Sequence, residues 1–166
     1  MIQSLDDKTP KIAESACISE FAYIVGDVEI GGNSTVWPGA VIRADFGKIR
    51  IGNNTHVEDN CVLHGNLTIG NNVIIGHGAV VHASVIGNDV LIGMNATILS
   101  KAEIESHVVI GAHTLIETGM KVPGESLVVG SPPKIKKLTV RSKPWAYRGE
   151  QSYYTNLARR YMENGF

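Results

Sequence analysis

Aliphatic residues recur at every sixth position through most of this chain. A unit of six residues is too short to hold both a helix and a strand, so each unit predicts one short strand followed by a bend. The chain must therefore coil. The repeated positions are Ile12, Ile18, Ile24, Ile30, Val36 and Ile42, then Ile51, Val57, Leu63, Ile69, Ile75 and Val81, and finally Ile86, Ile92, Ile98, Ile104, Ile110, Ile116, Val122 and Val128.

Small and turn-forming residues support the same interpretation. A small or β-branched residue stands two positions before most of the repeated aliphatic residues, as at Ala40, Cys61 and Ala79. Asn pairs such as Asn53-Asn54 separate the units and favour tight bends. One large and one small side chain per strand suits a narrow prism with tight corners. The pattern predicts an all-β solenoid.

The last part of the chain follows another period. Gly130-Ser131-Pro132-Pro133 ends the coil, because proline cannot donate to a sheet. Ser142 can cap a helix whose first turn contains Pro144. Tyrosines then recur at helical spacing, so a helix is predicted over about 143–163, packed on the outside of the prism. We expect residues 1–140 to form the coil and residues 141–166 the helical unit.

Composition narrows the classes of function. The chain has 166 residues, 43% hydrophobic and 6% aromatic, with a formal net charge of −1. This net charge argues against a partner such as nucleic acid or an anionic membrane, because proteins that bind them carry a basic surface. Residues 1–10 do not resemble a secretory signal, and no run of apolar residues is long enough for a membrane span. Two cysteines form no disulfide framework, so we expect a cytoplasmic protein.

The six-residue pattern over residues 10–133 resembles the hexapeptide-repeat proteins. This resemblance implies a left-handed parallel β-helix with three strands per turn. Residues eighteen apart then lie on the same face, one rung apart.

This geometry predicts where three histidines lie. His64 and His82 are eighteen residues apart and each follows a repeated aliphatic residue, so they stack on one outer face. His77 lies one strand earlier, around a corner, and would join them if two prisms packed side by side. Three imidazoles with an open fourth position are typical of catalytic zinc; ordinary surface histidines are the alternative. His56, His107 and His113 fall outside this register and are expected on the surface.

The sequence around these histidines contains more specific motifs. VWPGAVIRADFGKIRIGNNTHVEDNCVLHG and TIGNNVIIGHGAVVHASVIGNDVLIGMNATIL resemble the γ-class carbonic anhydrase family. The resemblance implies a homotrimer that hydrates CO2 with a metal hydroxide, the metal being Zn²⁺ by default or else Fe²⁺ or Co²⁺. It implies that His64 and His82 of one subunit and His77 of its neighbour bind the metal.

The same resemblance implies roles for three charged residues. Arg43, Asp45 and Asp59 would order the subunit interface beside the metal, and an arginine fork suits a bidentate contact with a carboxylate. Asp59 resembles the family aspartate that pairs with such an arginine. Arg43 and Asp45 are expected where the repeat breaks, in a loop with about three extra residues. A purely local pair is the alternative interpretation. Glu58 would steer the nucleophile, or serve as a general base. A side chain that simply faces solvent is the alternative for Glu58.

Two departures from the family pattern predict weak activity. Glu58 stands where the family usually has glutamine, and it adds a negative charge near the ion. Phe46 occupies the position of a carboxylate that assists proton export in the most active members. Slow or undetectable CO2 hydration is therefore an open outcome.

Two further functions remain alternatives. The tail around Trp145 and Tyr153-Tyr154 is similar to the carnitine-operon and phenylacetate-degradation branch of the family, which is associated with acyl-CoA metabolism. Lys134, Lys136 and Lys137 follow the coil, where hexapeptide acyltransferases carry a similar segment. An acyl-CoA thioesterase or acyltransferase is thus the second hypothesis. A non-catalytic assembly subunit is the third.

Overall fold

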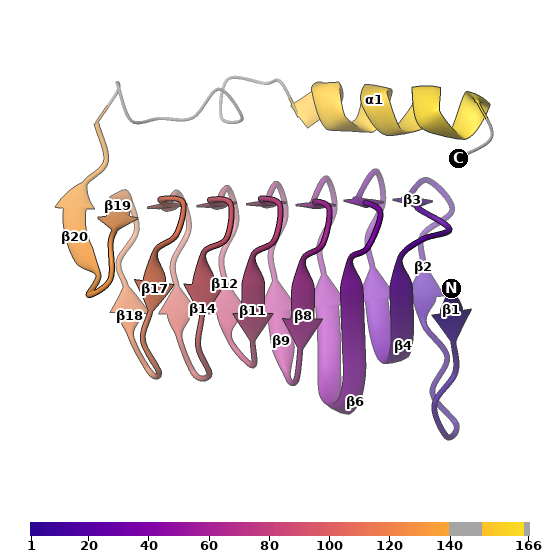
Figure 1. Ribbon diagram of the computed structural model, residues 1–166, viewed down its shortest axis with the longest axis horizontal. Coiled ribbons are helices and arrows are strands. Elements are labelled where there is room, and N and C mark those ends of the chain that lie inside the picture. The colour runs from indigo at the N-terminus through magenta and orange to yellow at the C-terminus, as the bar shows by residue number, and fades with distance from the viewer. Residues whose placement is uncertain (140–150, 165–166) are drawn as a thin grey trace.

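The computed structural model describes residues 1–139 and 151–164, and it confirms the coil that the sequence predicts. Short parallel strands stack into a left-handed column of about seven turns, which is drawn along its length in Figure 1. The column has three faces, and the outward side chains of each face differ in character. We name these faces by what they carry.

The histidine face holds both His64 and His82. It is formed by β1 (Ile2–Gln3), the first parts of β4 (Tyr23–Ile30) and β6 (Val41–Ile51), β8 (Val62–His64), β11 (Val80–His82), β14 (Thr97–Ile98) and β17 (Leu115–Ile116).

The charged face follows around the next corner. It is formed by β2 (Lys11–Ile12), the last parts of β4 and β6, β9 (Leu67–Ile69), β12 (Val85–Ile86), β15 (Glu103–Ile104) and β18 (Lys121–Val122).

The helix face completes the triangle. It is formed by β3 (Cys17–Ile18), β5 (Thr35–Val36), β7 (His56–Val57), β10 (Ile74–Ile75), β13 (Leu91–Ile92), β16 (Val109–Ile110), β19 (Ser126–Val129) and β20 (Lys134–Lys137). β20 runs antiparallel to β19 after the turn at Pro132-Pro133, which ends the coil.

The strand register confirms the eighteen-residue rung on the histidine face. His82 pairs with His64, and His64 pairs with Arg43, so the three residues form one column. One expectation is corrected here. Arg43 and Asp45 were expected in a loop at the break of the repeat, but they lie on β6, which continues across the corner as a single strand.

The core is the stack of repeated aliphatic side chains. Ile42, Leu63 and Val81 are completely buried on the histidine face, and Ile86 and Leu67 are buried on the charged face. The small residues two positions earlier, such as Ala40, Cys61 and Ala79, are also fully buried at the corners. Burial raises the pKa of the Cys61 thiol to about 12, so this cysteine is an uncharged packing residue.

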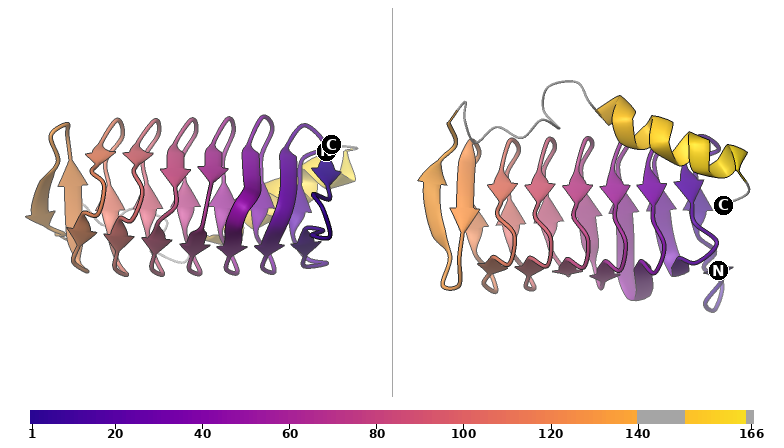
Figure 2. Two further views of the ribbon diagram at one scale, coloured as in Figure 1. Left: turned by 90° about the horizontal axis from the view of Figure 1, so that it is seen from below. Right: turned by 45° about the horizontal axis from the view of Figure 1, so that its top comes forward.

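The helix α1 (Gln151–Glu163) lies along the N-terminal rungs of the helix face, as both views in Figure 2 show. It contacts β3 and β5, buries Ala158, and places the Tyr161 ring 5.3 Å from that of Trp37. The predicted cap at Ser142, the first residues of the predicted helix and the expected boundary at residue 140 lie outside the described residues. No helix within 1–139 or 151–164 is long and apolar enough to cross a membrane.

Candidate metal centre

His64 and His82 meet on the outside of the histidine face. Their ring centroids are 5.0 Å apart. The Nε2 atom of His64 lies 2.9 Å from Asp45 Oδ1, and the Nδ1 atom of His82 lies 2.7 Å from the Ser100 hydroxyl. Among the described residues, the second ring nitrogen of each histidine has no hydrogen-bond partner. Each ring is therefore held through one nitrogen and retains the other for a ligand.

Asp45 connects the His64 ring to Arg43. One carboxylate oxygen of Asp45 contacts His64 and the other contacts Arg43 Nη1. Partial desolvation acts to raise the pKa of Asp45, but the His64 hydrogen bond and the Arg43 charge hold it below the usual value. Asp45 is therefore an anion over the ordinary pH range. The Arg43–Asp45 contact is local, and the described chain shows both residues beside His64.

Phe46 covers the two imidazoles from one side. Its ring centroid lies 4.7 Å from that of His64, edge to face, and 6.3 Å from that of His82. The side chain is 54% exposed, although it is large and apolar. Phe46 offers the site an apolar wall and no group that carries a proton.

His77 projects from the corner between β10 and β11. Gly76 and Gly78 flank it, and Gly78 has a φ of +70°. A Cβ atom at Gly78 would lie 2.4 Å from Asn95 Oδ1, so the corner requires glycine there. The resulting bend leaves the His77 side chain 50% exposed at the edge of the histidine face.

Two carboxylates hold His77 in the single chain. Asp59 Oδ2 is 2.9 Å from Nδ1, and Glu58 Oε2 is 3.2 Å from Nε2. Glu58 also accepts a hydrogen bond from the His77 backbone N–H at 3.1 Å. An ion bound by His77 must therefore displace one of these carboxylates. The His77–Asp59 contact was not predicted, because Asp59 was expected to pair with an arginine.

Glu58 also joins the site to the helix. It is buried, with 3% of its surface exposed, and its carboxylate shares a hydrogen bond with the Tyr154 hydroxyl of α1. Burial, then the hydrogen bond and charge of Glu58, raise the pKa of Tyr154, so the phenol remains protonated. The alternative that Glu58 simply faces solvent is excluded by its burial.

His56 corrects a prediction, because it is not a surface residue. It is completely buried on the helix face, where its ring stacks on Tyr154 at 4.9 Å between centroids. Its Nδ1 lies 2.9 Å from the Thr35 hydroxyl, and its Nε2 is buried without a hydrogen-bond partner in the described chain. Burial lowers the pKa of His56 to about 4. His107 and His113 are exposed, as predicted.

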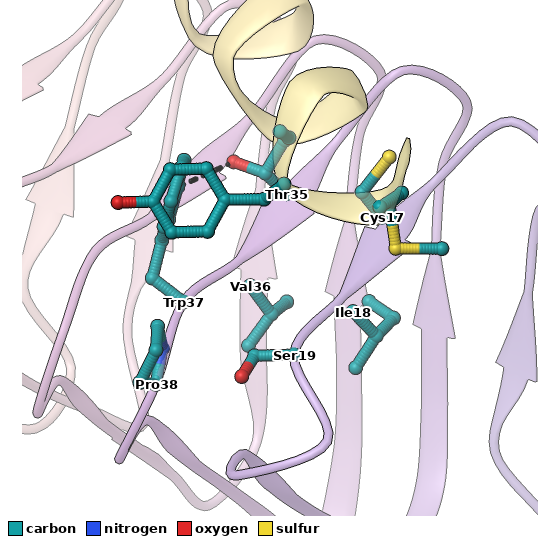
Figure 3. A pocket seen from close by; sticks show the side chains of 10 residues that line it. Cys17, Ile18, Ser19, Thr35, Val36, Trp37 and Pro38 are labelled. Atoms are coloured by element: carbon teal, nitrogen blue, oxygen red, sulfur yellow. Dashed lines mark hydrogen bonds between the residues drawn. The ribbon is translucent and has the colours of Figure 1, made fainter. Parts of the chain in front are cut away.

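A small cavity lies beneath α1, away from the histidines. It has a volume of about 40 Å³, room for a few water molecules, and is lined mainly by apolar side chains from β3, β5 and the helix. Figure 3 shows it between Trp37, Ile18 and Cys17 and the helix. Neither a charged side chain nor a histidine of the described chain lines this cavity, so the histidine face is the better candidate site.

Within residues 1–139 and 151–164 of one chain, no three His, Cys, Asp or Glu side chains converge as a metal site. The chemistry of the donors nevertheless fits a metal. His64 and His82 each retain one ring nitrogen, and neutral imidazole is a common ligand of zinc, iron and cobalt. Within one chain the third histidine, His77, lies at a separate corner, where Asp59 and Glu58 contact it.

Comparison with known proteins gives the family. The model of the family "Bacterial transferase hexapeptide (six repeats)" matches residues 9–44, 48–83 and 83–118. The chain belongs to this hexapeptide family. A solved hexapeptide transferase family protein from Anaplasma phagocytophilum is 32% identical, with a TM-score of 0.91 over 95% of this chain and 96% of that one.

Two other relatives of this hexapeptide protein differ in the activity their names indicate. A carbonic anhydrase of Geobacillus kaustophilus is 44% identical over 64 residues, which cover 39% of this chain and 35% of that protein. A candidate acetyltransferase from Bacillus cereus is 36% identical, with a TM-score of 0.92 over 96% of this chain and 95% of that one. The match to the carbonic anhydrase thus spans about a third of that relative.

Proposed function

We propose that this chain forms a homotrimeric metalloenzyme of the γ-class carbonic anhydrase type, which hydrates CO2 to bicarbonate. His64 and His82 of one subunit and His77 of the next would bind one metal ion at each interface. Zinc is the default ion, and iron or cobalt would suit the same imidazoles. The similarity to the Geobacillus carbonic anhydrase supports this choice of reaction.

One observation carries the proposal: the two stacked imidazoles lie on an apolar outer face. The outward column beside them is made of Tyr23, Val41, Val62, Val80, Thr97 and Leu115. Val80 is 37% exposed, and α1 contacts β3 and β5 of another face. A continuous apolar face of this kind is typical of a surface that a partner covers. A second copy would cover it and bring in a third histidine.

Each residue of the site has a task in this proposal. A bound zinc ion would supply hydroxide at neutral pH by acidifying a water molecule. Asp45 orients the His64 ring, while Arg43 holds Asp45. Asp59 keeps one nitrogen of His77 so that the ring presents the other. Glu58, released from His77 Nε2, would accept a hydrogen bond from the nucleophile and steer it.

The proposal predicts slow turnover. Each hydration of CO2 produces one proton that must reach solvent, and Phe46 is the side chain beside His64 and His82. An apolar ring cannot relay that proton. Glu58 is the nearest buried acid, and its contacts with Tyr154 and His77 restrict its movement.

Metal analysis tests the site. Purified wild-type protein should contain about one zinc, iron or cobalt ion per chain, and His64→Ala, His82→Ala and His77→Ala should each lose it. His113→Asn is the matched control, since His113 is exposed at a corner with φ of +55°, a conformation that Asn tolerates. Metal retained by His77→Ala would contradict an interfacial site.

A second candidate is acyl-CoA chemistry, either thioester hydrolysis or acyl transfer. The identity to the Bacillus cereus candidate acetyltransferase over nearly the whole chain favours it. Lys134, Lys136 and Lys137 are exposed on β20 and could meet phosphates. A non-catalytic trimer with an inactive site is the remaining alternative.

Parallel assays separate these functions. Stopped-flow CO2 hydration above that of His64→Ala supports the carbonic anhydrase proposal. Cleavage of acyl-CoA that depends on the lysines, with no CO2 hydration, supports the second candidate. Metal-loaded protein without either activity supports the assembly subunit.

A further inference from the structure

Ser100 lies one rung beyond His82, at the corner that follows β14. Its hydroxyl oxygen is 2.7 Å from His82 Nδ1. Its backbone carbonyl accepts a hydrogen bond from Gly119 N at 2.9 Å, so the residue is fixed to the next rung as well. In the described chain the Ser100 side chain has no other hydrogen bond, and it is directed at the histidine ring.

We propose that Ser100 is a positioning residue that sets the tautomer of His82. In this arrangement the serine oxygen accepts a hydrogen bond from Nδ1–H, which leaves the lone pair of the neutral ring on Nε2. This inference rests on the metal site proposed above. The nitrogen that carries the proton in a neutral imidazole is decided by the hydrogen bond at the other nitrogen, and metal ligands are oriented in this way.

The covalent structure of histidine favours this tautomer for a site between two chains. Nδ1 is attached to the carbon that carries Cβ, so it stays near its own backbone, where Ser100 lies. Nε2 is at the outer end of the ring and reaches beyond the face. For His82 this tautomer leaves the lone pair at the outer end of the ring, towards a second subunit, whereas His64, whose Nε2 contacts Asp45, retains Nδ1.

Comparison with His64 shows how a serine partner differs from a carboxylate partner. Its ring is held by a carboxylate, Asp45, which is itself paired with Arg43. His82 is held by a neutral hydroxyl, which orients the ring and adds no charge beside the ion. Together the two contacts fix both rings while placing only one anion next to them. Replacing Ser100 should therefore disorient His82 and leave the charge of the site unchanged.

Nitrogen NMR of the metal-free protein tests the tautomer directly. At pH 8, ¹⁵N-labelled wild-type protein should show His82 protonated at Nδ1, and Ser100→Ala should shift the signal towards the Nε2–H form. Ser100→Thr keeps a hydroxyl and should restore the wild-type pattern. Protonation of wild-type His82 at Nε2, or an unchanged tautomer in Ser100→Ala, would overturn the proposal.

Zinc affinity gives the functional readout. Ser100→Ala should bind zinc roughly 10- to 100-fold more weakly, the usual effect of losing a hydrogen bond to a metal ligand. Ser106→Ala is the matched control, because Ser106 also bonds across a corner, accepting from Asn88 N at 3.0 Å, but does not contact a histidine ring. If Ser100→Ala binds zinc as tightly as wild type, the serine proposal fails and the metal site stands. If wild type binds no metal, the proposed metal site fails, and the nitrogen NMR of the metal-free protein still decides the serine proposal.

Discussion

The histidine face and the charged face belong to one coil and have nearly the same interior. They differ in the side chains that point outward, which stack in columns along the coil. Val80 on β11 and Val85 on β12 are consecutive outward valines, 37% and 52% exposed, one on each face. Val80 continues an apolar column. Val85 lies in a column with mostly charged or polar neighbours: Glu29, Arg50, Thr68, Glu103 and Lys121.

This difference separates the part of the sequence that makes the fold from the part that makes the site. The inward residues of both faces are buried aliphatic side chains, which stack in the same way wherever they occur. The outward residues contribute little to the coil and can vary. On the charged face they favour contact with water. On the histidine face they suit the second copy of the chain and the shared ion that we propose.

The largest expected effect comes from the two outward valines. Val80→Glu would bury a carboxylate at each interface, which costs on the order of 3 kcal/mol or more per interface, so the trimer should dissociate and its metal be lost. Val85→Glu places the same charge on the charged face and should change neither the trimer nor its metal content. Light scattering after gel filtration measures the mass. Equal masses for the two variants would remove the distinction between the faces.

Sequence reasoning predicted well whatever the inward repeat determines. The coil, the buried aliphatic stack and the pairing of His64 with His82 all follow from residue spacing. Prediction from the sequence was wrong where a segment distant in the chain covers a residue. His56 occupies an outward position like many exposed ones, and it is buried because α1, almost a hundred residues later, covers it.

The finer contacts of the site were also beyond the sequence. The Ser100 contact and the His77–Asp59 contact depend on how side chains turn at the corners, which spacing alone does not determine. The continuous strand through Arg43 and Asp45 was missed because three extra residues suggested a loop, whereas the hydrogen bonds of β6 continue across the corner.

The next effect tests whether the interiors of the two faces are equivalent. Leu63 on β8 and Leu67 on β9 are both fully buried, one beneath each face. Leu63→Ala and Leu67→Ala should each lower the free energy of unfolding by about 2–5 kcal/mol, because each leaves a cavity in the stack. Urea unfolding at one protein concentration measures this. A loss confined to one variant would show that the interiors differ.

A comparable effect is expected on the helix face, and it depends on pH. The pKa of His56 is lowered to about 4 in the folded chain, whereas an unfolded histidine has a pKa near 6.5. Its neutral ring therefore stabilises the fold fully above pH 6.5, and this contribution is lost as the pH falls towards 4. At most, this contribution of His56 to the free energy of unfolding is about 3 kcal/mol.

Thermal unfolding from pH 8 to pH 5 measures the contribution of His56. His56→Phe keeps a ring against Tyr154 but cannot bind a proton, so its stability should fall less steeply with acid than that of wild type. Identical slopes for the two proteins would show that His56 is not responsible.

The smallest effect concerns the charged face alone. Arg50 binds Asp27 at 2.7 Å and Glu29 at 3.2 Å on the surface, and its hydrogen bond is the main reason that the pKa of Asp27 is lowered. Arg50→Ala should lower the free energy of unfolding slightly at low salt and less at high salt, with no change of mass or metal content. A loss of assembly in this variant would place an interface on the charged face.

Subunit mixing tests most directly whether two copies complete the metal site. His77→Ala lacks the corner histidine, and the double variant His64→Ala/His82→Ala lacks the stacked pair, so neither should bind metal alone. Co-refolded in equal amounts, they should recover about a quarter of the wild-type metal, because each mixed trimer regains one intact interface. A mixture as devoid of metal as its two components, although mixed trimers form, would contradict the account.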